Sequence, residues 1–228
     1  TASMLAAFTN KFFSSGDWLI SRAGAEEIKK EIYMFRTILQ KAPNRRTWME
    51  KRLAKIQRRV YQGLNGELVL EPYEGNIPPH YDPQDPYSDP GFHDLSGDEY
   101  FNYRLVHQLS WHTYKINTYQ RERTRLQWFI LIAGGGGAVL AALGGQFSLW
   151  VALTAAFTSA FIGWQELRNL DSIVRNFSKV IMELNLMFNH WNNLEADEKT
   201  DSEFYRMVSS TEEILWAQNV EYIKSMQE

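Results

Sequence analysis

Hydrophobic residues in this chain are concentrated in one long uncharged stretch. Residues 126–165 form a run of 40 positions without a charged side chain, bounded by Arg125 and Glu166. A single helix of that length would extend about 60 Å, twice the thickness of the hydrocarbon core of a bilayer. Two helices of about 18 residues each would cross the bilayer with little tilt. The pattern therefore predicts a transmembrane helical hairpin rather than one long span.

The turn of this hairpin is predicted at Gly144-Gly145-Gln146, because glycine adopts the positive φ values of tight turns at little cost. The spans would then cover residues 126–143 and 147–164. Aromatic residues near the span ends fit the two membrane interfaces. Basic residues precede the first span and follow the second, at the end of the hairpin opposite the turn. The positive-inside rule predicts a multi-pass membrane protein in contact with lipid, with most of the chain on the cytoplasmic side. The alternative, a hairpin buried in a large soluble core, is disfavoured because the other segments are so polar.

Small residues recur at every fourth position in both spans, and such faces let helix backbones approach closely in lipid. The candidate helix-packing residues are Gly134, Ala138 and Ala142 in the first span and Ala152, Ala156 and Ala160 in the second. Each of the four consecutive glycines at 134–137 costs a helix about 1 kcal/mol relative to alanine. This run predicts either very close packing, which we favour, or a flexible point.

The second span also carries a polar face, formed by Thr154, Thr158 and Gln165. In an oligomer such a face could line a water-filled path, which makes these three residues pore-lining candidates. The alternative is that each threonine hydroxyl donates to a carbonyl of its own helix. The spans contain no charged residue, which argues against a proton relay or a voltage sensor.

Long helices are predicted on both sides of the hairpin, within one unit at residues 97–228. Ser96 and Glu99 form a capping box, so a helix should begin near Gly97 and continue into the first span. Thr200 and Glu203 predict the start of a last helix. After the second span, apolar residues alternate at spacings of four and three: Leu170, Val174, Phe177, Ile181, Leu184, Phe188 and Trp191. This seam is typical of a coiled coil and is the candidate oligomerisation seam, although its partner could equally be another helix of the same chain.

The remaining segments differ in character. Residues 14–62 are predicted to form a cytoplasmic helical hairpin, whose basic second helix would lie either on anionic headgroups or at the solvated face of a bundle. Its first helix has one apolar face: Ile28, Ile32, Phe35 and Leu39. Residues 63–96 are rich in Pro, Asp and Gly and are predicted to be a linker. Residues 6–12 match residues 155–161 at five of seven positions, so residues 1–13 are a candidate tail of an earlier transmembrane span.

Composition limits the chemistry that the chain could perform. The net charge of −3 does not favour a nucleic-acid partner, and the absence of cysteine excludes disulfides and thiolate chemistry. The five histidines show no metal-ligand spacing, and no nucleophile–base set emerges. We therefore expect no enzyme activity, no catalytic residues, no metal and no cofactor.

Several motifs resemble the SLATT family, the two-transmembrane domain associated with SMODS nucleotide-signalling and SLOG sensor proteins. They are Ala25-Glu26-Glu27-Ile28-Lys29-Lys30-Glu31-Ile32-Tyr33 with Arg36, Asp89-Pro90-Gly91-Phe92 with Asp94-Leu95, and Tyr103-Arg104-Leu105 leading to Gln108-Leu109-Ser110-Trp111 and Lys115. The chain looks like a tandem member whose first hairpin is mostly absent. The resemblance implies an all-α membrane protein whose hairpin extends into a cytoplasmic helical bundle or coiled coil. It also implies a pore-forming or channel-like effector, gated by a sensor domain or a sensor protein, and it supplies no catalytic residues.

Two hypotheses follow for the function. The first is an oligomeric membrane channel or pore-forming effector, formed by several copies of this chain. The second is a membrane-anchored scaffold or assembly subunit without transport activity, which the many Trp and Tyr residues outside the spans favour.

Overall fold

The computed structural model describes residues 15–66, 74–75, 81–85 and 88–225, which form helices joined by turns with no strand among them. Two compact units are present, and we describe each by itself. The bundle unit comprises residues 1–108 and 183–228, and the hairpin unit comprises residues 109–182. The candidate tail of an earlier span, residues 1–13, lies outside the described residues.

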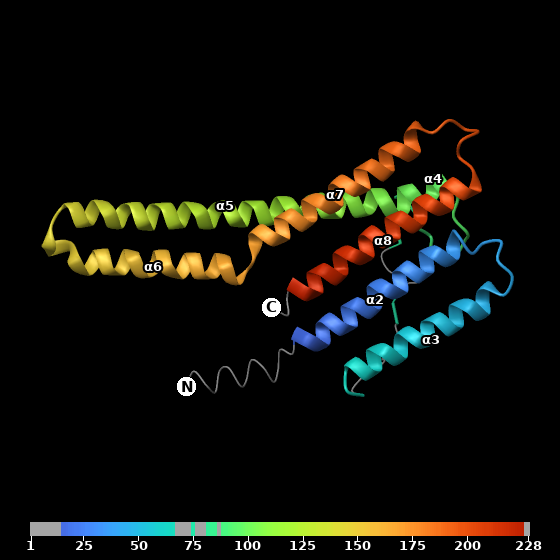
Figure 1. The fold of residues 1–228 in the computed structure, drawn as a ribbon, viewed down its shortest axis with the longest axis horizontal. Helices are drawn as coiled ribbons and strands as arrows, with labels where there is room; N and C mark the ends of the chain where they lie inside the picture. The colour runs from blue at the N-terminus through green and yellow to red at the C-terminus, as the bar shows by residue number, and fades with distance from the viewer. Residues whose placement is uncertain (1–14, 67–73, 76–80, 86–87, 226–228) are drawn as a thin grey trace. The chain divides into compact units, whose positions relative to one another are not determined.

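The helices are, in chain order, α2 (Ser15–Arg36), α3 (Arg45–Gly63), α4 (Gly97–Tyr100), the π-helix η1 (Phe101–Val106), α5 (His107–Ala142), the 3-10 helix η2 (Gly145–Phe147), α6 (Ser148–Leu167), α7 (Leu170–Asn193) and α8 (Asp201–Ser225), as Figure 1 shows. Two helical stretches are long and apolar enough to cross a membrane. They extend over 46 residues from Gly97 to Ala142 and over 49 residues from Gly145 to Asn193. The predicted all-α fold with two candidate spans is therefore confirmed.

In the bundle unit, α2 lies between α3 and α8 (Figure 1). The approach of α2 to α3 depends on Gly24, because a Cβ atom there would lie 2.4 Å from the Cγ2 atom of Val60. Ile56 of α3 is 1% exposed, so the apolar side of α3 packs within the bundle. This packing agrees with a helix at the solvated face of a bundle, while Trp48 and Tyr61 of α3 stay 39% and 52% exposed.

The interface between α2 and α3 also contains ion pairs that the apolar pattern of α2 did not predict. Glu27 and Glu31 are buried on α2, and their carboxylates bind Arg59 and Arg52 of α3 at 2.8 Å. The predicted apolar face of α2 is less buried, since Ile32 is 37% exposed. The acidic side of α2 faces α3 because α3 supplies the arginines that neutralise it.

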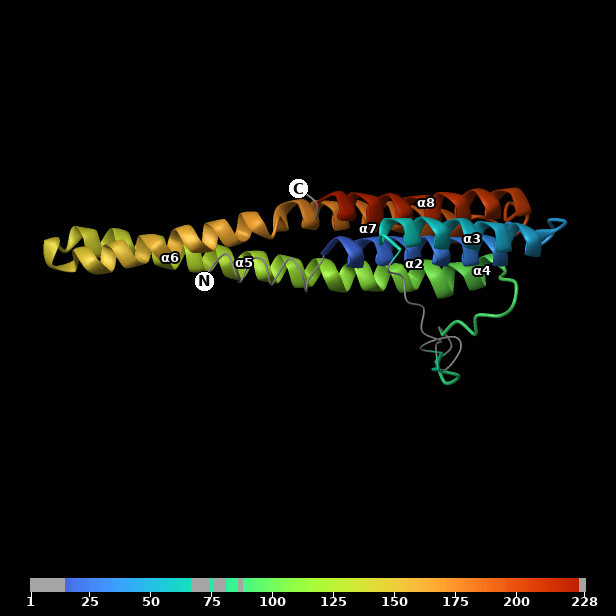
Figure 2. The same ribbon diagram turned by 90° about the horizontal axis from the view of Figure 1, so that it is seen from below.

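Aromatic rings near the start of α4 and at the end of α7 pack together in the bundle unit, and α8 lies beside α7 (Figure 2). The ring of Trp191 stacks on that of Phe101 with centroids 4.9 Å apart, and its Nε1 donates to Asp98 at 2.9 Å. A Cβ atom on Gly97 would lie 2.3 Å from the Trp191 ring. The predicted capping box of Ser96 and Glu99 is present, so the helix begins where its sequence indicates.

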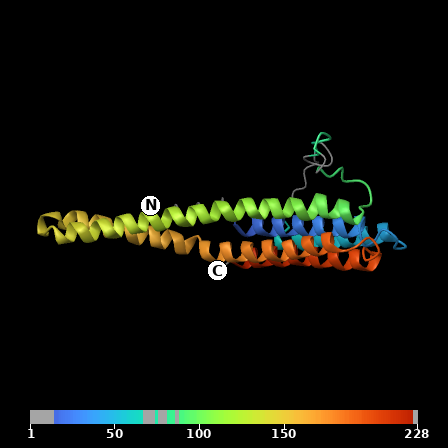
Figure 3. The same ribbon diagram turned by 90° about the horizontal axis from the view of Figure 1, so that it is seen from above.

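In the hairpin unit, α5 and α6 lie side by side and antiparallel (Figures 1 and 3). Gly144 follows α5 with a φ of 108°, and η2 begins at the next residue. The turn thus falls at the predicted glycines, where the left-handed backbone excludes most other residues. A second break separates α6 from α7 at Arg168 and Asn169, where Asn169 has a φ of 45°.

Candidate functional site in the membrane hairpin

The two spans contact each other through glycines of α5 and threonines of α6. Gly137 is buried, and a Cβ atom there would lie 2.6 Å from the Oγ1 atom of Thr154. One turn earlier, the same atom on Gly134 would lie 3.8 Å from Thr158. The glycine run therefore supports close packing within the hairpin, since Gly137 sits where a larger residue would force the helices apart.

The pore-lining candidates lie on the side of α6 that faces α5. Thr154 donates its hydroxyl to the carbonyl of Val151 at 2.9 Å, and Thr158 donates to the carbonyl of Thr154 at 2.8 Å. Both hydroxyls are thus satisfied within their own helix, which is the alternative weighed from the sequence. Gln165 lies two turns further along this face, and its side-chain oxygen is buried without a hydrogen-bond partner among the described residues. The three pore-lining candidates therefore share one face of α6, and that face lies at the contact between the two spans of one chain.

The other candidate helix-packing positions have exposed side chains, as Gly134 itself is exposed. Ala138, Ala142, Ala152, Ala156 and Ala160 are all exposed within the chain. On α6, four of the exposed small residues lie on one face with spacings of four, three and four: Ala152, Ala156, Ser159 and Gly163. At 3.6 residues per turn, this face is roughly opposite the side occupied by Thr154 and Thr158. We call it the small face of α6, and within the described chain no helix covers it.

The seam of α7 packs against helices of the same chain. In the hairpin unit, Val174 and Phe177 form a core with Ile116 of α5, and Trp111, Tyr119 and Ile181 pack around it. In the bundle unit, Leu184 is 0% exposed, and the Trp191 ring contacts those of Phe101 and Phe204. Leu170 is also buried, and Phe188 is half-buried. Of the two partners considered for this seam, the structure provides the one within the chain, and a role in oligomerisation stays a prediction.

Two ion pairs join α5 to the break between α6 and α7. Arg168, which follows α6, binds Glu122 at 3.0 Å, and Asp171, in the first turn of α7, binds Arg123 at 3.0 Å. The adjacent residues Glu122 and Arg123 thus hold the two sides of the break. This clasp of two ion pairs was not predicted from the sequence, although two opposite charges lie before one span and two after the other.

A buried ion pair lies in the bundle unit where η1 meets α8. The Nε and Nη2 atoms of Arg104 donate to the two carboxylate oxygens of Glu212 at 2.9 and 3.0 Å. The hydroxyl of Tyr100 donates to the same carboxylate at 3.0 Å, and the Tyr33 ring lies 4.6 Å from the guanidinium. Burial and the charge of Glu212 raise the pKa of Tyr100 well above its usual value, so this phenol stays protonated as a donor. A π-helix often marks a functional position, and here it carries the buried arginine.

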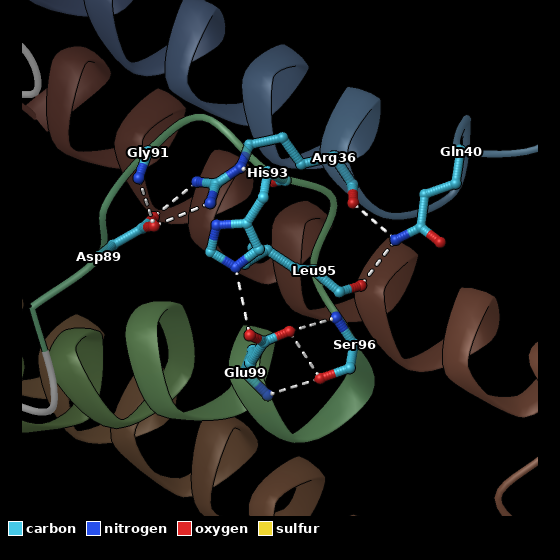
Figure 4. Close-up of polar contacts among 8 residues, drawn as sticks. All are labelled: Arg36, Gln40, Asp89, Gly91, His93, Leu95, Ser96 and Glu99. Carbon is cyan, nitrogen blue, oxygen red and sulfur yellow. Dashed lines mark hydrogen bonds and ion pairs between the residues drawn. The ribbon is translucent and has the colours of Figure 1, made fainter.

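A second polar cluster fixes the chain entering α4 onto the end of α2 (Figure 4). Arg36 binds both carboxylate oxygens of Asp89 at 2.6 and 2.7 Å, and its Nε donates to the carbonyl of His93 at 2.9 Å. Gln40 donates to the carbonyl of Leu95 at 2.6 Å, whose own N–H donates to the carbonyl of Arg36 at 2.8 Å. Residues 88–96 therefore form an ordered attachment, at the end of the predicted linker.

This attachment is expected to weaken in acid. Partial burial alone would raise the pKa of Asp89, but hydrogen bonds from Arg36 and from the N–H of Gly91 outweigh it and hold the pKa below 3.8. The stability that this carboxylate contributes is therefore present above about pH 4 and is lost as the pH falls further. Asp89→Asn should lower the free energy of unfolding at pH 7 by about 1–2 kcal/mol and make the acid dependence less steep.

Thermal unfolding of the full chain between pH 7 and pH 3 measures both effects. Glu213→Gln, which removes an exposed carboxylate of α8, is the matched control and should leave both quantities unchanged. Equal melting temperatures and equal acid dependence for the two variants would contradict a stabilising role for Asp89.

The features described in the two units are packing surfaces and ion pairs. Among the described residues, no group of three or more His, Asp or Glu side chains could hold a metal ion. The hairpin is formed by two helices that are long and apolar enough to cross a membrane, which is the pattern of a helical membrane protein.

The sequence model of the SMODS and SLOG-associating 2TM effector domain 1, SLATT_1, matches residues 100–222, more than half of the 228-residue chain. The chain belongs to this family, and the resemblance inferred from its motifs is confirmed. The matched region contains both candidate spans, so the chain is a membrane protein of an effector family. Comparison with curated proteins and with solved structures gave no match.

Proposed function

We propose that this SLATT protein is the subunit of an oligomeric membrane channel or pore, with the bundle unit on the cytoplasmic side. The observation that carries the proposal is the small face of α6, which is uncharged, exposed and directed away from α5. Two helices alone cannot enclose a water-filled path, so a pore would need several copies. A face of small residues is what lets neighbouring hairpins approach closely in lipid, where no hydrophobic force drives association.

The proposal assigns different roles to the two sides of α6. Thr154 and Thr158 support the contact within one hairpin, while Ala152 and Ala156 would support the contact between copies. An ion path between copies would then be lined by uncharged residues. The helices that extend out of the membrane would open and close this path. The basic flanks favour the cytoplasm for those helices, and a sensor domain or sensor protein acting on the bundle unit would supply the signal. Ion passage through such a channel involves no chemical reaction.

Ion flux through liposomes containing the full chain tests this function, with the oligomeric mass measured in the same preparation. Ala156→Trp places a large ring on the small face of α6 and is expected to lower both the mass and the flux at least tenfold. Leu149→Trp is the control, because Leu149 is large and 77% exposed near the turn of the hairpin. It should leave mass and flux within about twofold of the original chain, as surface substitutions generally do.

A scaffold without transport activity is the second candidate. The observation in its favour is the set of exposed aromatic side chains in the bundle unit, which are typical anchors of protein interfaces: Trp18, Tyr61 and Phe92, at 53%, 52% and 75% exposed. A monomer that passes no ions, with Ala156→Trp unchanged in mass, would contradict the channel and support the scaffold.

A further inference from the structure

We infer that α5 carries a binding site for an anionic phospholipid where it leaves the membrane, formed by Arg121, Arg125 and Trp128. These residues follow one another at spacings of four and three, so they share one side of the helix. Both arginines are exposed, and the Trp128 ring is 58% exposed. At 3.6 residues per turn, this side is roughly opposite the side of Gly137 that contacts α6.

The other charges near this boundary already have partners in the hairpin unit. Glu122 binds Arg168 and Arg123 binds Asp171, each at 3.0 Å. No ion pair or hydrogen bond of Arg121 or Arg125 occurs among the described residues. The guanidinium groups of Arg121 and Arg125 therefore have no paired carboxylate among the described residues. The nearest carboxylate on the same helix, that of Glu122, is paired with Arg168.

The position of these arginines identifies the ligand. Arg125 is the last charged residue before the 40 uncharged positions that begin at residue 126. Its guanidinium therefore lies at the depth of the lipid headgroups, and an arginine there can bind a phosphate through two parallel N–H donors. Trp128 lies one turn deeper, where an indole ring packs against the glycerol and upper acyl region. A headgroup with net negative charge satisfies both arginines, whereas the choline of a zwitterionic lipid would place a cation beside them.

The site does not depend on transport, so it stands or falls separately from the proposed channel. It requires only that the hairpin crosses a bilayer. The occupant is the lipid of that bilayer, because both the charged and the aromatic parts of the site face outward from the hairpin at one interface. A bound lipid of this kind would stabilise the helix end that the Glu122 and Arg123 clasp joins to α6 and α7.

Thermal unfolding of the full chain in neutral detergent, with added phosphatidylglycerol or phosphatidylcholine, tests the inference. Phosphatidylglycerol at saturation is expected to raise the melting temperature by about 5 °C more than phosphatidylcholine does. Arg121→Gln with Arg125→Gln should abolish this difference. Arg121→Lys with Arg125→Lys keeps the charge but not the forked donors, and should retain only part of the difference.

The matched control is Lys55→Gln with Arg58→Gln, which removes two exposed basic residues from α3 in the bundle unit. It changes the net charge equally and should keep the full effect of phosphatidylglycerol. The inference is overturned if the control loses the effect to the same extent, which would indicate nonspecific charge attraction. It is also overturned if the double glutamine variant keeps the effect, or if the two lipids stabilise the original chain equally.

Discussion

Glu212→Gln is expected to lower the free energy of unfolding of the bundle unit by about 3–5 kcal/mol. The substitution keeps the size of the side chain but removes the charge that compensates Arg104, which is 5% exposed. An uncompensated guanidinium in the protein interior loses its hydration without regaining an equivalent interaction. The melting temperature of the full chain, followed by tryptophan fluorescence, should fall by roughly 6–20 °C for a domain of this size.

Two further variants show whether the buried pair itself is responsible. Glu203→Gln disrupts exposed pairs with Arg206 and with His190, and each exposed pair contributes less than about 1 kcal/mol. Arg104→Met combined with Glu212→Leu removes both charges and should recover most of the lost stability, because apolar residues of similar volume replace buried pairs well. A double variant as unstable as Glu212→Gln would show that packing, and not charge compensation, accounts for the loss.

Gly137→Val is expected to destabilise the hairpin by about 1–3 kcal/mol, the usual cost of adding atoms to a packed interface. Its Cβ atom would lie 2.6 Å from the Thr154 hydroxyl oxygen and 3.4 Å from the Thr154 Cβ atom, so the two spans would have to separate. The midpoint of unfolding in a titration with denaturing detergent, followed by helical circular dichroism, measures the effect.

Gly135→Val provides the matched control two residues away. A Cβ atom on Gly135 meets nothing within 4 Å, so the same substitution there should leave the midpoint nearly unchanged. Thr154→Ala, added to Gly137→Val, removes the oxygen of the closest contact and should restore part of the stability. Equal effects of valine at the two glycines would mean that helix propensity, and not the contact with Thr154, decides the result.

The features that sequence analysis predicted correctly are those determined by neighbouring residues. The turn at Gly144 and the capping box at Ser96 each depend on fewer than about ten consecutive positions. The two candidate spans depend on one continuous hydrophobic run. Such patterns fix where a helix begins, ends or enters lipid, whatever the rest of the chain does.

The features that it missed depend on residues far apart in the sequence. Arg104 and Glu212 are separated by 108 positions, and nothing in the local spacing relates them. The polar face of α6 follows from helical periodicity, but periodicity does not reveal which surface that face contacts. Thr154 and Thr158 therefore contact α5, and the exposed small residues on the other side of α6 became the candidates for assembly.

The two long helical stretches differ in mechanical continuity. Within the hairpin unit, the helical backbone of α5 continues without a break up to Ala142. The stretch after the turn is interrupted at Asn169, where a left-handed residue lets α6 and α7 change direction through a few dihedral angles. Within the hairpin unit, the helix before the turn is therefore continuous, whereas the helix after it has one point at which its direction can change.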